Sequence, residues 1–421
     1  MPVKNSKLSG FYKKDMEERI EEIKKVCDLS DEDVQRLFER GVSHEEADRM
    51  IENVIGTFEL PVGIATNFKI NGKDYLVPMV IEESSVVAAA SNAAKMARET
   101  GGFSASTTDP VMIAQVQVTG VDAPHEARLK VLEKKDELME LADEQDPVLV
   151  KFGGGARDVR CRVLDGGYGP YLIVHLLVDC RDAMGANAVN TMAEALAPRI
   201  EEITGGKVYL RILSNLAKYR LARARVVYSK DVLGEDTVKG VLHAYEFARI
   251  DDFRCATHNK GVMNGITAMV LATGNDTRAI EAGAHSYASI SGRYSPLTTW
   301  EENEAGDLVG SIEVPLAVGT VGGMTSTHNV VKTNLKILGV ESANELAEVI
   351  ASVGLAQNFA ALRALAKEGI QEGHMKLHAQ NVAVAAGAEG ELIETIANRM
   401  IEEKKVRADR AEELLKELGK D

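Results

Sequence analysis

Residues 111–118 read VMIAQVQV, an apolar run rich in β-branched residues that is typical of a strand. A charged segment at helical spacing follows over about 124–144, and two more strands are predicted at 159–164 and 171–178. A helix that begins at Asp182 and a final strand, KVYLRILS, complete the series. This order of strand, helix, strand, strand, helix and strand indicates a ferredoxin-type split βαβ module.

The flanking regions predict a larger structure of helices and short strands. Residues 12–54 have the helical spacing of an opening arm, and Asn71-Gly72 indicates a hairpin between two short β-branched runs. An Ala-rich helix follows, SSVVAAASNAAKMARETGG, and helical patterns dominate from residue 235 to the end. We therefore expect an α+β chain in which the ferredoxin-like module is inserted between two halves of a larger domain.

The composition excludes several classes of protein. The net charge of −15 argues against a nucleic-acid partner, because a phosphate backbone demands a basic face. The four cysteines are far apart in the sequence, which indicates neither a zinc site nor a disulfide framework. No apolar run approaches the roughly 18 residues that span a bilayer, and the N-terminus is charged. A cytoplasmic protein with neither membrane nor metal is expected.

The common nucleotide and metal motifs are also missing. The glycine-rich stretches GGGAR and GGYGP do not have the GxGxxG spacing, and GGKV lacks the hydroxyl residue of a P-loop. The segment DAMGANAVNTMAEALAPRI offers another phosphate site, since Asp182 could cap a helix whose first turn contains Gly185. Asn187 would add a donor. Taken alone, this segment favours a capped amphipathic helix with a packing glycine over a phosphate site.

Four polar residues are the candidates for chemistry. Lys260 lies in HNKGVMNG, among residues that make turns and close backbone contacts, which suggests either a positioned cation or a solvated loop lysine. Glu83 lies between a strand and a helix, Asp276 at a predicted strand-to-helix turn, and His374 within GHMKLH. Each of the last three has an ordinary interpretation as a helix cap or a core histidine. Together they suit a carbonyl reduction, in which an oxyanion develops and protons are delivered while a dinucleotide supplies hydride.

Several sequence blocks, taken in order from residue 52 to 380, resemble one known family. They are ENVIG with PVGIA, PMVIEESSVVAAAS, DAMGANAVNTMAEA, THNKGVMNG, ATGND, VGTVGG and GHMKLH. These blocks are similar to those of the class II 3-hydroxy-3-methylglutaryl-coenzyme A (HMG-CoA) reductases. The resemblance implies reduction of HMG-CoA by NADH or NADPH in two steps to mevalonate and CoA, as in isoprenoid biosynthesis, or the reverse oxidation.

The resemblance also implies roles for the candidate catalytic residues. Lys260 would stabilise the oxyanion, and Glu83 would donate a proton to it. Asp276 would lie between these two side chains and hydrogen-bond the lysine. His374 would protonate the departing CoA thiolate.

Binding residues are implied on matching positions. Ser85, Arg254 and Asn264 would bind the hydroxymethylglutaryl group, with the guanidinium of Arg254 facing its carboxylate. The cofactor would be held by Asp182, Met184, Gly185 and Asn187. Asp146, ahead of the strand-like VLVKF, could accept a ribose 2′-hydroxyl and repel a 2′-phosphate, which favours NADH slightly over NADPH.

By the same resemblance, the chain divides into three parts. Residues 1–109 and 219–368 would form the large substrate-binding domain, 110–218 the inserted dinucleotide-binding small domain, and 369–421 a C-terminal flap that closes over CoA. The active sites would lie at the interface of a homodimer, and a higher oligomer stays possible. Two alternatives remain: an acyl-CoA thioester hydrolase and a CoA-binding dimer without activity.

Overall fold

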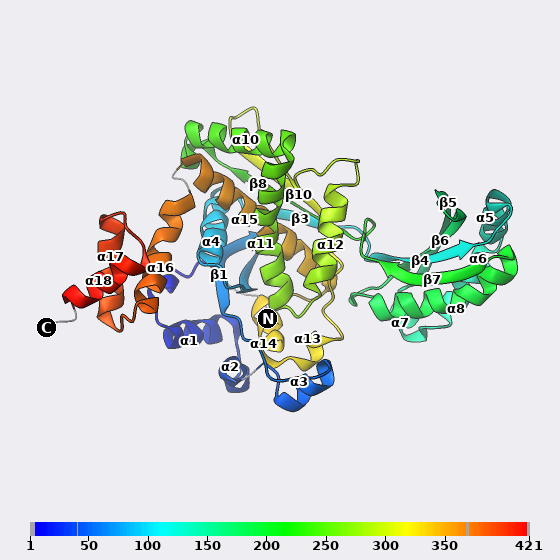
Figure 1. The fold of residues 1–421 in the computed structure, drawn as a ribbon, viewed down its shortest axis with the longest axis horizontal. Helices are drawn as coiled ribbons and strands as arrows, with labels where there is room; N and C mark the ends of the chain where they lie inside the picture. The colour runs from blue at the N-terminus through cyan, green and yellow to red at the C-terminus, as the bar shows by residue number, and fades with distance from the viewer. Residues whose placement is uncertain (1–4, 40, 368–369, 419–421) are drawn as a thin grey trace.

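The N-terminal arm consists of short helices with strong start signals. The computed structural model describes residues 5–39, 41–367 and 370–418, with only the backbone described for 367 and 370–377. The arm contains η1(Phe11–Lys13), α1(Met16–Cys27), α2(Asp31–Phe38) and α3(His44–Met50). Each of α1, α2 and α3 starts with a capping box, in which an Asp or Ser side chain and an acidic side chain three residues later satisfy each other's backbone N–H groups. The predicted helical arm is therefore confirmed (Figure 1).

A hairpin and a helix follow the arm. Strands β1(Val62–Ile70) and β2(Lys73–Val80) pair antiparallel, and Asn71 and Gly72 both have positive φ, as the predicted hairpin turn requires. The chain then enters α4(Val86–Ala97) and the short η2(Arg98–Thr100). The turn between β2 and α4, which carries Glu83, is thus held by buried elements on both sides.

The central part of the chain is a four-stranded antiparallel sheet with helices packed on it. Its strand order is β3-β8-β10-β9, made by β3(Ser104–Thr107), β8(Leu221–Tyr228), β9(Thr298–Glu302) and β10(Leu308–Pro315). The accompanying helices are α9(Lys230–Leu233), α10(Glu235–Ile250), α11(Asp252–Ala272), α12(Thr277–Ala288), α13(Met324–Thr327), α14(Asn329–Leu338) and α15(Ala343–Lys367). The rings of Tyr228 and Phe359 stack with centroids 3.7 Å apart and join α15 to the sheet.

Helix α15 is the one helix among the described residues that combines great length with an apolar composition. By length and composition it could cross a membrane, contrary to the expectation that no segment would. Most of it is buried between the sheet, α4 and α11, with Leu346, Ile350 and Leu355 fully buried. Its apolar character is that of a core helix.

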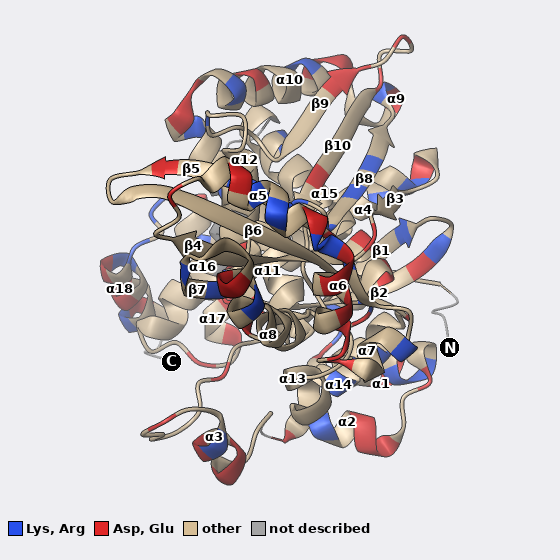
Figure 2. Ribbon diagram, turned by 90° about the vertical axis from the view of Figure 1, so that its right-hand side faces the viewer, with Lys and Arg blue, Asp and Glu red and all other residues tan. Residues whose placement is uncertain are grey.

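The segment from 111 to 214 projects to one side of the molecule (Figure 1). It contains β4(Val111–Thr119), α5(Pro124–Glu133), α6(Lys135–Asp143), α7(Pro147–Lys151), β5(Gly155–Gly166), β6(Gly169–Asp179), α8(Ala186–Thr204) and β7(Lys207–Ser214). The strands pair antiparallel in the order β5-β6-β4-β7. Figure 2 shows this sheet with α5, α6 and α8 beside it, and with acidic and basic residues interspersed over this side of the molecule.

Three details of this segment differ from the predictions. The charged helix is broken at Lys134 into α5 and α6. The strand-like VLVKF is instead the short helix α7, because Asp146 caps it and Pro147 occupies its first position. Helix α8 begins at Ala186 rather than at Asp182, since Gly185 adopts a left-handed conformation with φ 100° as the N-cap.

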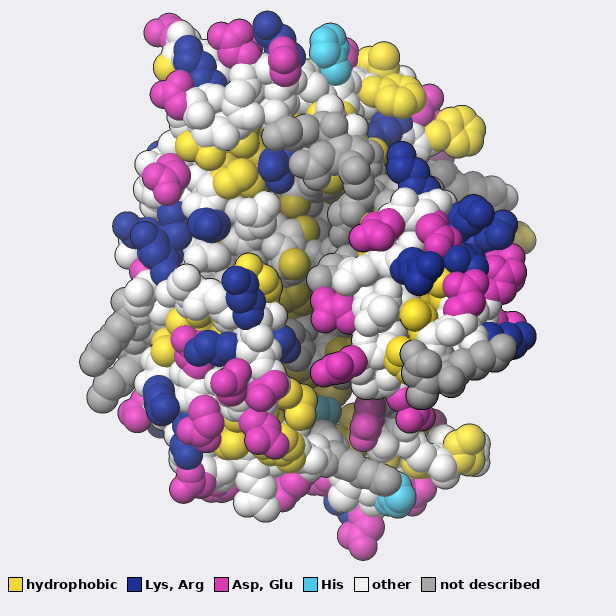
Figure 3. Space-filling model, turned by 90° about the vertical axis from the view of Figure 1, so that its left-hand side faces the viewer, with side chains coloured by type: hydrophobic (Ala, Val, Ile, Leu, Met, Phe, Trp, Pro, Cys, Tyr) yellow, Lys and Arg dark blue, Asp and Glu magenta, His cyan; other side chains and the backbone are white. Residues whose placement is uncertain are grey.

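The C-terminal helices form a separate small core. They are α16(Ile370–Ala385), α17(Glu391–Glu402) and α18(Ala408–Leu418), and they lie at the opposite end of the molecule from α5–α8 (Figure 1). Ala379, Ile396, Met400 and Leu414 are buried among themselves, apart from the main core. The face that carries these helices is hollowed, and hydrophobic side chains are visible in the hollow (Figure 3).

Candidate active site

Lys260 lies in the middle of α11 and not in a loop. The prediction of a turn at HNKG is wrong because its polar and small residues serve helix packing. Asn259 is fully buried, where its amide donates to the carbonyl of Ser295 and accepts from the N–H of Leu297. At Gly265 an added Cβ would lie 2.9 Å from the carbonyl oxygen of Val353, so this glycine lets α11 and α15 approach closely.

The structure brings Lys260 and Glu83 together although they are far apart in the sequence. The Lys260 ammonium donates to Glu83 Oε2 at 2.5 Å, and the Asn264 amide contacts the same oxygen at 3.4 Å. Lys260 and Asn264 are one helical turn apart, so they share a face of α11. The pair is partly exposed, with 58% of the lysine and 37% of the glutamate side chain accessible. One carboxylate oxygen is therefore surrounded by a cation and an amide, while the ion pair remains open to a ligand.

Two of the predicted substrate-binding residues lie close to this pair in the sequence, Ser85 just after Glu83 and Arg254 six residues before Lys260. Ser85 is the N-cap of α4 with φ 71° and no side-chain cap hydrogen bond. A left-handed conformation is strained for a serine, and such strain is found mainly where a function retains it. Arg254 lies on α11 about two turns before Lys260, half-buried, and burial lowers its pKa. Within the described part of the chain, its guanidinium makes neither a hydrogen bond nor an ion pair.

Asp276 is placed away from the Lys260–Glu83 pair. It is the N-cap of α12, where its carboxylate accepts from the N–H groups of Arg278 and Ala279 at 3.0 Å. Asp276 thus lies at a turn between two helices. The prediction of a strand before it is wrong, because most of ITAMVLAT belongs to α11. From Lys260 to the end of α11 the helix rises about 18 Å, so the same chain does not place Asp276 against Lys260 as predicted.

The residues predicted to hold the cofactor lie at the turn before α8. Residues 182–185, which we term the DAMG turn, end in Gly185, where an added Cβ would lie 2.3 Å from Cys180 Sγ. Asp182 does not cap α8; its carboxylate accepts from the N–H of Ala343 at the start of α15. Helix α8 therefore has no side-chain cap, and Asn187 is exposed in its first turn. An uncapped helix N-terminus of this kind fits a phosphate group of a dinucleotide.

The two remaining predicted residues lie in other elements. Asp146 caps α7 by accepting from the N–H of Leu149 at 2.9 Å. His374 lies within α16, and its side chain is outside the described residues.

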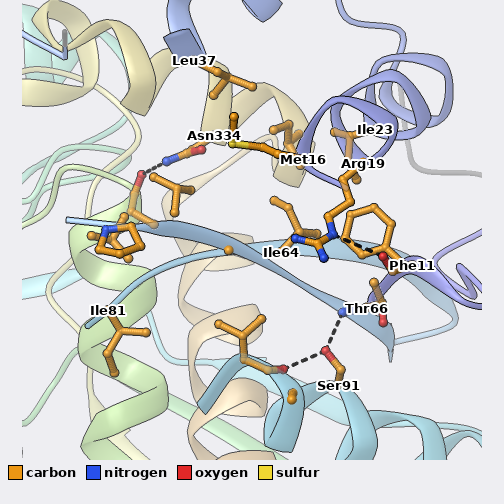
Figure 4. Close-up of a pocket in the computed structure, with 18 of the residues that line it drawn as sticks. Phe11, Met16, Arg19, Ile23, Leu37, Ile64, Thr66, Ile81, Ser91 and Asn334 are labelled. Atoms are coloured by element: carbon orange, nitrogen blue, oxygen red, sulfur yellow. Dashed lines mark hydrogen bonds between the residues drawn. The ribbon is translucent and has the colours of Figure 1, made fainter. Parts of the chain in front are cut away.

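A cavity of about 1700 Å³ opens beside Glu83 and Ser85. It lies between the N-terminal arm, β1, the start of α4 and α14, and its lining is largely apolar (Figure 4). Figure 4 shows Phe11, Met16, Ile23 and Ile64 on its walls, with the guanidinium of Arg19 hydrogen-bonded to the Phe11 carbonyl. The sequence had given no indication of this cavity, because its walls come from segments that no motif connects.

Two further polar residues near the DAMG turn had not been predicted. The Asn275 amide hydrogen-bonds both the N–H and the carbonyl of Gly319, and Arg220 donates to the carbonyls of Ala183 and Met184. Asn275 directly precedes Asp276 within a recognised block, and that position was the one available signal for it. Among the described residues, no group of three His, Cys, Asp or Glu side chains has the arrangement of a metal site.

Comparison with known proteins places the chain in one family over most of its length. The sequence profile of the hydroxymethylglutaryl-coenzyme A reductase family matches residues 15–379. The 3-hydroxy-3-methylglutaryl-coenzyme A reductase of Archaeoglobus fulgidus is 60% identical over 98% of this chain and 95% of its own length. A probable reductase of the same name from Borreliella burgdorferi is 38% identical over 89% of this chain and 86% of its own length.

Solved structures are similar over the same extent. The 3-hydroxy-3-methylglutaryl-coenzyme A reductase of Streptococcus pneumoniae superposes with a TM-score of 0.84 at 43% identity, covering 97% of this chain and 99% of that chain. A structure of the class II enzyme from the same organism, bound to NADPH in open conformations, gives 0.82 at 44% identity over 85% of this chain and 99% of that chain.

The fold and the site define a nicotinamide-dependent oxidoreductase of mixed helices and sheets. The chain belongs to the class II 3-hydroxy-3-methylglutaryl-coenzyme A reductase family. The acyl-CoA hydrolase alternative has no support from the comparisons.

Proposed function

We propose that Lys260, Glu83 and Asn264 form the reducing centre for HMG-CoA, and the 2.5 Å contact between Lys260 and Glu83 is the observation that carries the proposal. The ammonium stabilises a carbonyl oxygen placed beside it as negative charge develops on that oxygen. Glu83 is within reach of the same oxygen and supplies its proton. The bound nicotinamide dinucleotide supplies the hydride.

The acyl group is held by residues on either side of this centre. The unpaired guanidinium of Arg254 offers a planar fork of donors to the free carboxylate of the hydroxymethylglutaryl group. Ser85 and Asn264 bind its remaining oxygens. The cavity beside Glu83 gives the long CoA thioester a route to the surface, lined by apolar side chains suited to its methylene groups.

We propose that the working unit is a homodimer in which Asp276 reaches Lys260 and Glu83 from the second copy. The position of Asp276 beyond the end of α11 supports this arrangement. The extended segment before β1 supports it as well, because the apolar side chains of Ile51, Ile55 and Phe58 are largely exposed there. Large exposed apolar side chains in one segment are typical of an interface.

The proposed domains follow the three-part division predicted from the sequence. Residues 110–218 form a ferredoxin-like small domain that binds the dinucleotide, which its strand order and the uncapped α8 support. Residues 1–109 and 219–368 form the large domain. Residues 369–421 form the flap, and the separate core of α16–α18 supports its movement as a unit that carries His374 to the CoA thiolate. Asp146 and the DAMG turn accept NADH or NADPH, with NADH favoured by the Asp146 carboxylate.

The test is a steady-state assay of HMG-CoA reduction with each cofactor, followed by nicotinamide absorbance. Lys260→Ala is expected to lower kcat by at least about 10²-fold, the effect of removing an oxyanion-stabilising group. Lys239→Ala removes an exposed lysine of α10 and serves as the control. CoA release without nicotinamide oxidation, or full activity of Lys260→Ala, would contradict the proposal.

A further inference from the structure

The side chain of Arg220 is buried directly behind the DAMG turn. It is 4% exposed, and its guanidinium donates to three backbone carbonyls. Two of these belong to the turn, Ala183 and Met184, both at 3.0 Å, and the third is Val318 at 2.5 Å. One side chain thus connects the turn with the loop after β10.

Arg220 has no carboxylate partner within ion-pair distance among the described residues. The two nearest carboxylates that act on it are used elsewhere: Asp179 pairs with Arg157 and Arg181, and Asp182 accepts from the N–H of Ala343. Burial lowers the pKa of Arg220. A buried cation without a direct ion pair is costly, so the fold retains a charge here that hydrophobic packing alone would not select.

The same contacts orient the backbone of the turn. The carbonyl oxygens of Ala183 and Met184 accept from Arg220, and among the described residues they accept no hydrogen bond from the N–H groups at the start of α8. Gly319 holds the other side, since an added Cβ there would lie 2.6 Å from the Met184 nitrogen. The turn is therefore shaped by Arg220 and by the loop that contains Val318 and Gly319.

We propose that Arg220 is a positioning residue for the diphosphate of the nicotinamide dinucleotide. It fixes the DAMG turn so that the N–H groups at the start of α8 are available to the anion, and its positive charge adds to the positive end of the α8 dipole. This inference rests on the proposed function, because it assumes that the dinucleotide binds at the start of α8.

The experiment measures dissociation constants of three probes for the full-length protein and its variants. ADP-ribose contains the diphosphate without the nicotinamide, AMP lacks the diphosphate linkage, and NADH is the complete cofactor. Arg220→Gln is expected to weaken ADP-ribose and NADH about 10- to 100-fold, as for loss of charge-assisted hydrogen bonds, and AMP by much less. Arg220→Lys keeps the charge without the fork of donors, and is expected to lose less than Arg220→Gln.

Arg128→Gln is the matched control, since its half-buried guanidinium donates to the carbonyl of Cys161 in the same segment, away from the turn. Thermal unfolding establishes that each variant folds. If Arg220→Gln does not fold, the binding constants of Arg220→Lys alone test the inference. Unchanged binding of ADP-ribose, or equal weakening of ADP-ribose and AMP, overturns the inference. A wild-type protein that binds ADP-ribose but does not reduce HMG-CoA refutes the proposed function separately.

Discussion

His258 is buried in α11 two residues before Lys260, with only one of its ring nitrogens paired. Its Nε2 lies 2.7 Å from the Thr298 hydroxyl, while Nδ1 has no hydrogen-bond partner among the described groups. Burial, with a smaller effect from Arg254, lowers the pKa of His258 to about 3. The imidazole therefore stays neutral in the folded protein at neutral pH.

This burial predicts a pH-dependent stability. In the unfolded chain the imidazole titrates near its ordinary pKa, so below that pH the unfolded state binds more protons than the folded state. The stability that the neutral His258 preserves is then fully present above about pH 6.5, and the free energy of unfolding falls as the pH drops toward the folded pKa. We expect urea unfolding to show lower stability at about pH 5 than at neutral pH, and a smaller difference in His258→Gln. An identical pH difference in the variant would show that His258 is not responsible.

At the scale of the element, α11 positions the site through its packing on α15. Gly261 and Gly265 lie on the same helix, but only Gly265 is in close contact with its neighbour. An added Cβ would lie 2.9 Å from the Val353 carbonyl oxygen and the Gln357 Cβ at Gly265, and 3.7 Å from the Ala361 Cβ at Gly261. Substitution of each glycine by alanine therefore gives a matched comparison of how close packing affects the free energy of unfolding.

We expect Gly265→Ala to lower the free energy of unfolding by about 1–3 kcal/mol, because the new methyl group overpacks the interface between the helices. Gly261→Ala is expected to be neutral or stabilising by up to about 1 kcal/mol, since alanine favours a helix and the space is free. Urea unfolding of both variants measures this difference. Equal effects at the two positions would mean that close approach to α15 does not set the cost.

At the scale of the whole molecule, the proposed reducing centre of one chain does not include Asp276. Glu83, Lys260 and Asn264 meet within the chain, while Asp276 caps α12 beyond the far end of α11. In the proposed symmetric dimer, the Asp276 carboxylate would come from the second copy, and each chain would give to its partner what it receives.

This arrangement predicts complementation between inactive variants. Lys260→Ala and Asp276→Ala are each expected to be nearly inactive. After the two are mixed, unfolded and refolded together, part of the activity should return, because a mixed dimer contains one site with both residues intact. Each variant refolded alone is the control, and its activity should stay low. If mass measurement shows that mixed dimers have formed and no activity returns, the Asp276 and Lys260 of one site belong to the same chain.

Local patterns in the sequence predicted much of the structure. The helical arm, the Asn71-Gly72 hairpin, the strand-helix order of 111–214 and the placement of Glu83 before α4 all depend on neighbouring residues, so they could be predicted. The errors occurred where distant residues decide the outcome. The polar HNKG stretch is helical because the Asn259 amide hydrogen-bonds the backbone of Ser295 and Leu297, and because the side of α11 that carries its glycines packs against α15.

The sequence by itself determined most of the elements, the family and the identity of the candidate residues, since these depend on residue type and spacing along the chain. Only the tertiary structure decided which residues meet. It placed the Lys260 ammonium on Glu83, separated Asp276 from both, assigned Asp182 to α15 instead of α8, and set Arg220 behind the DAMG turn. Such contacts join segments distant in the chain, and the packing of buried surfaces that selects them is not written in any local pattern.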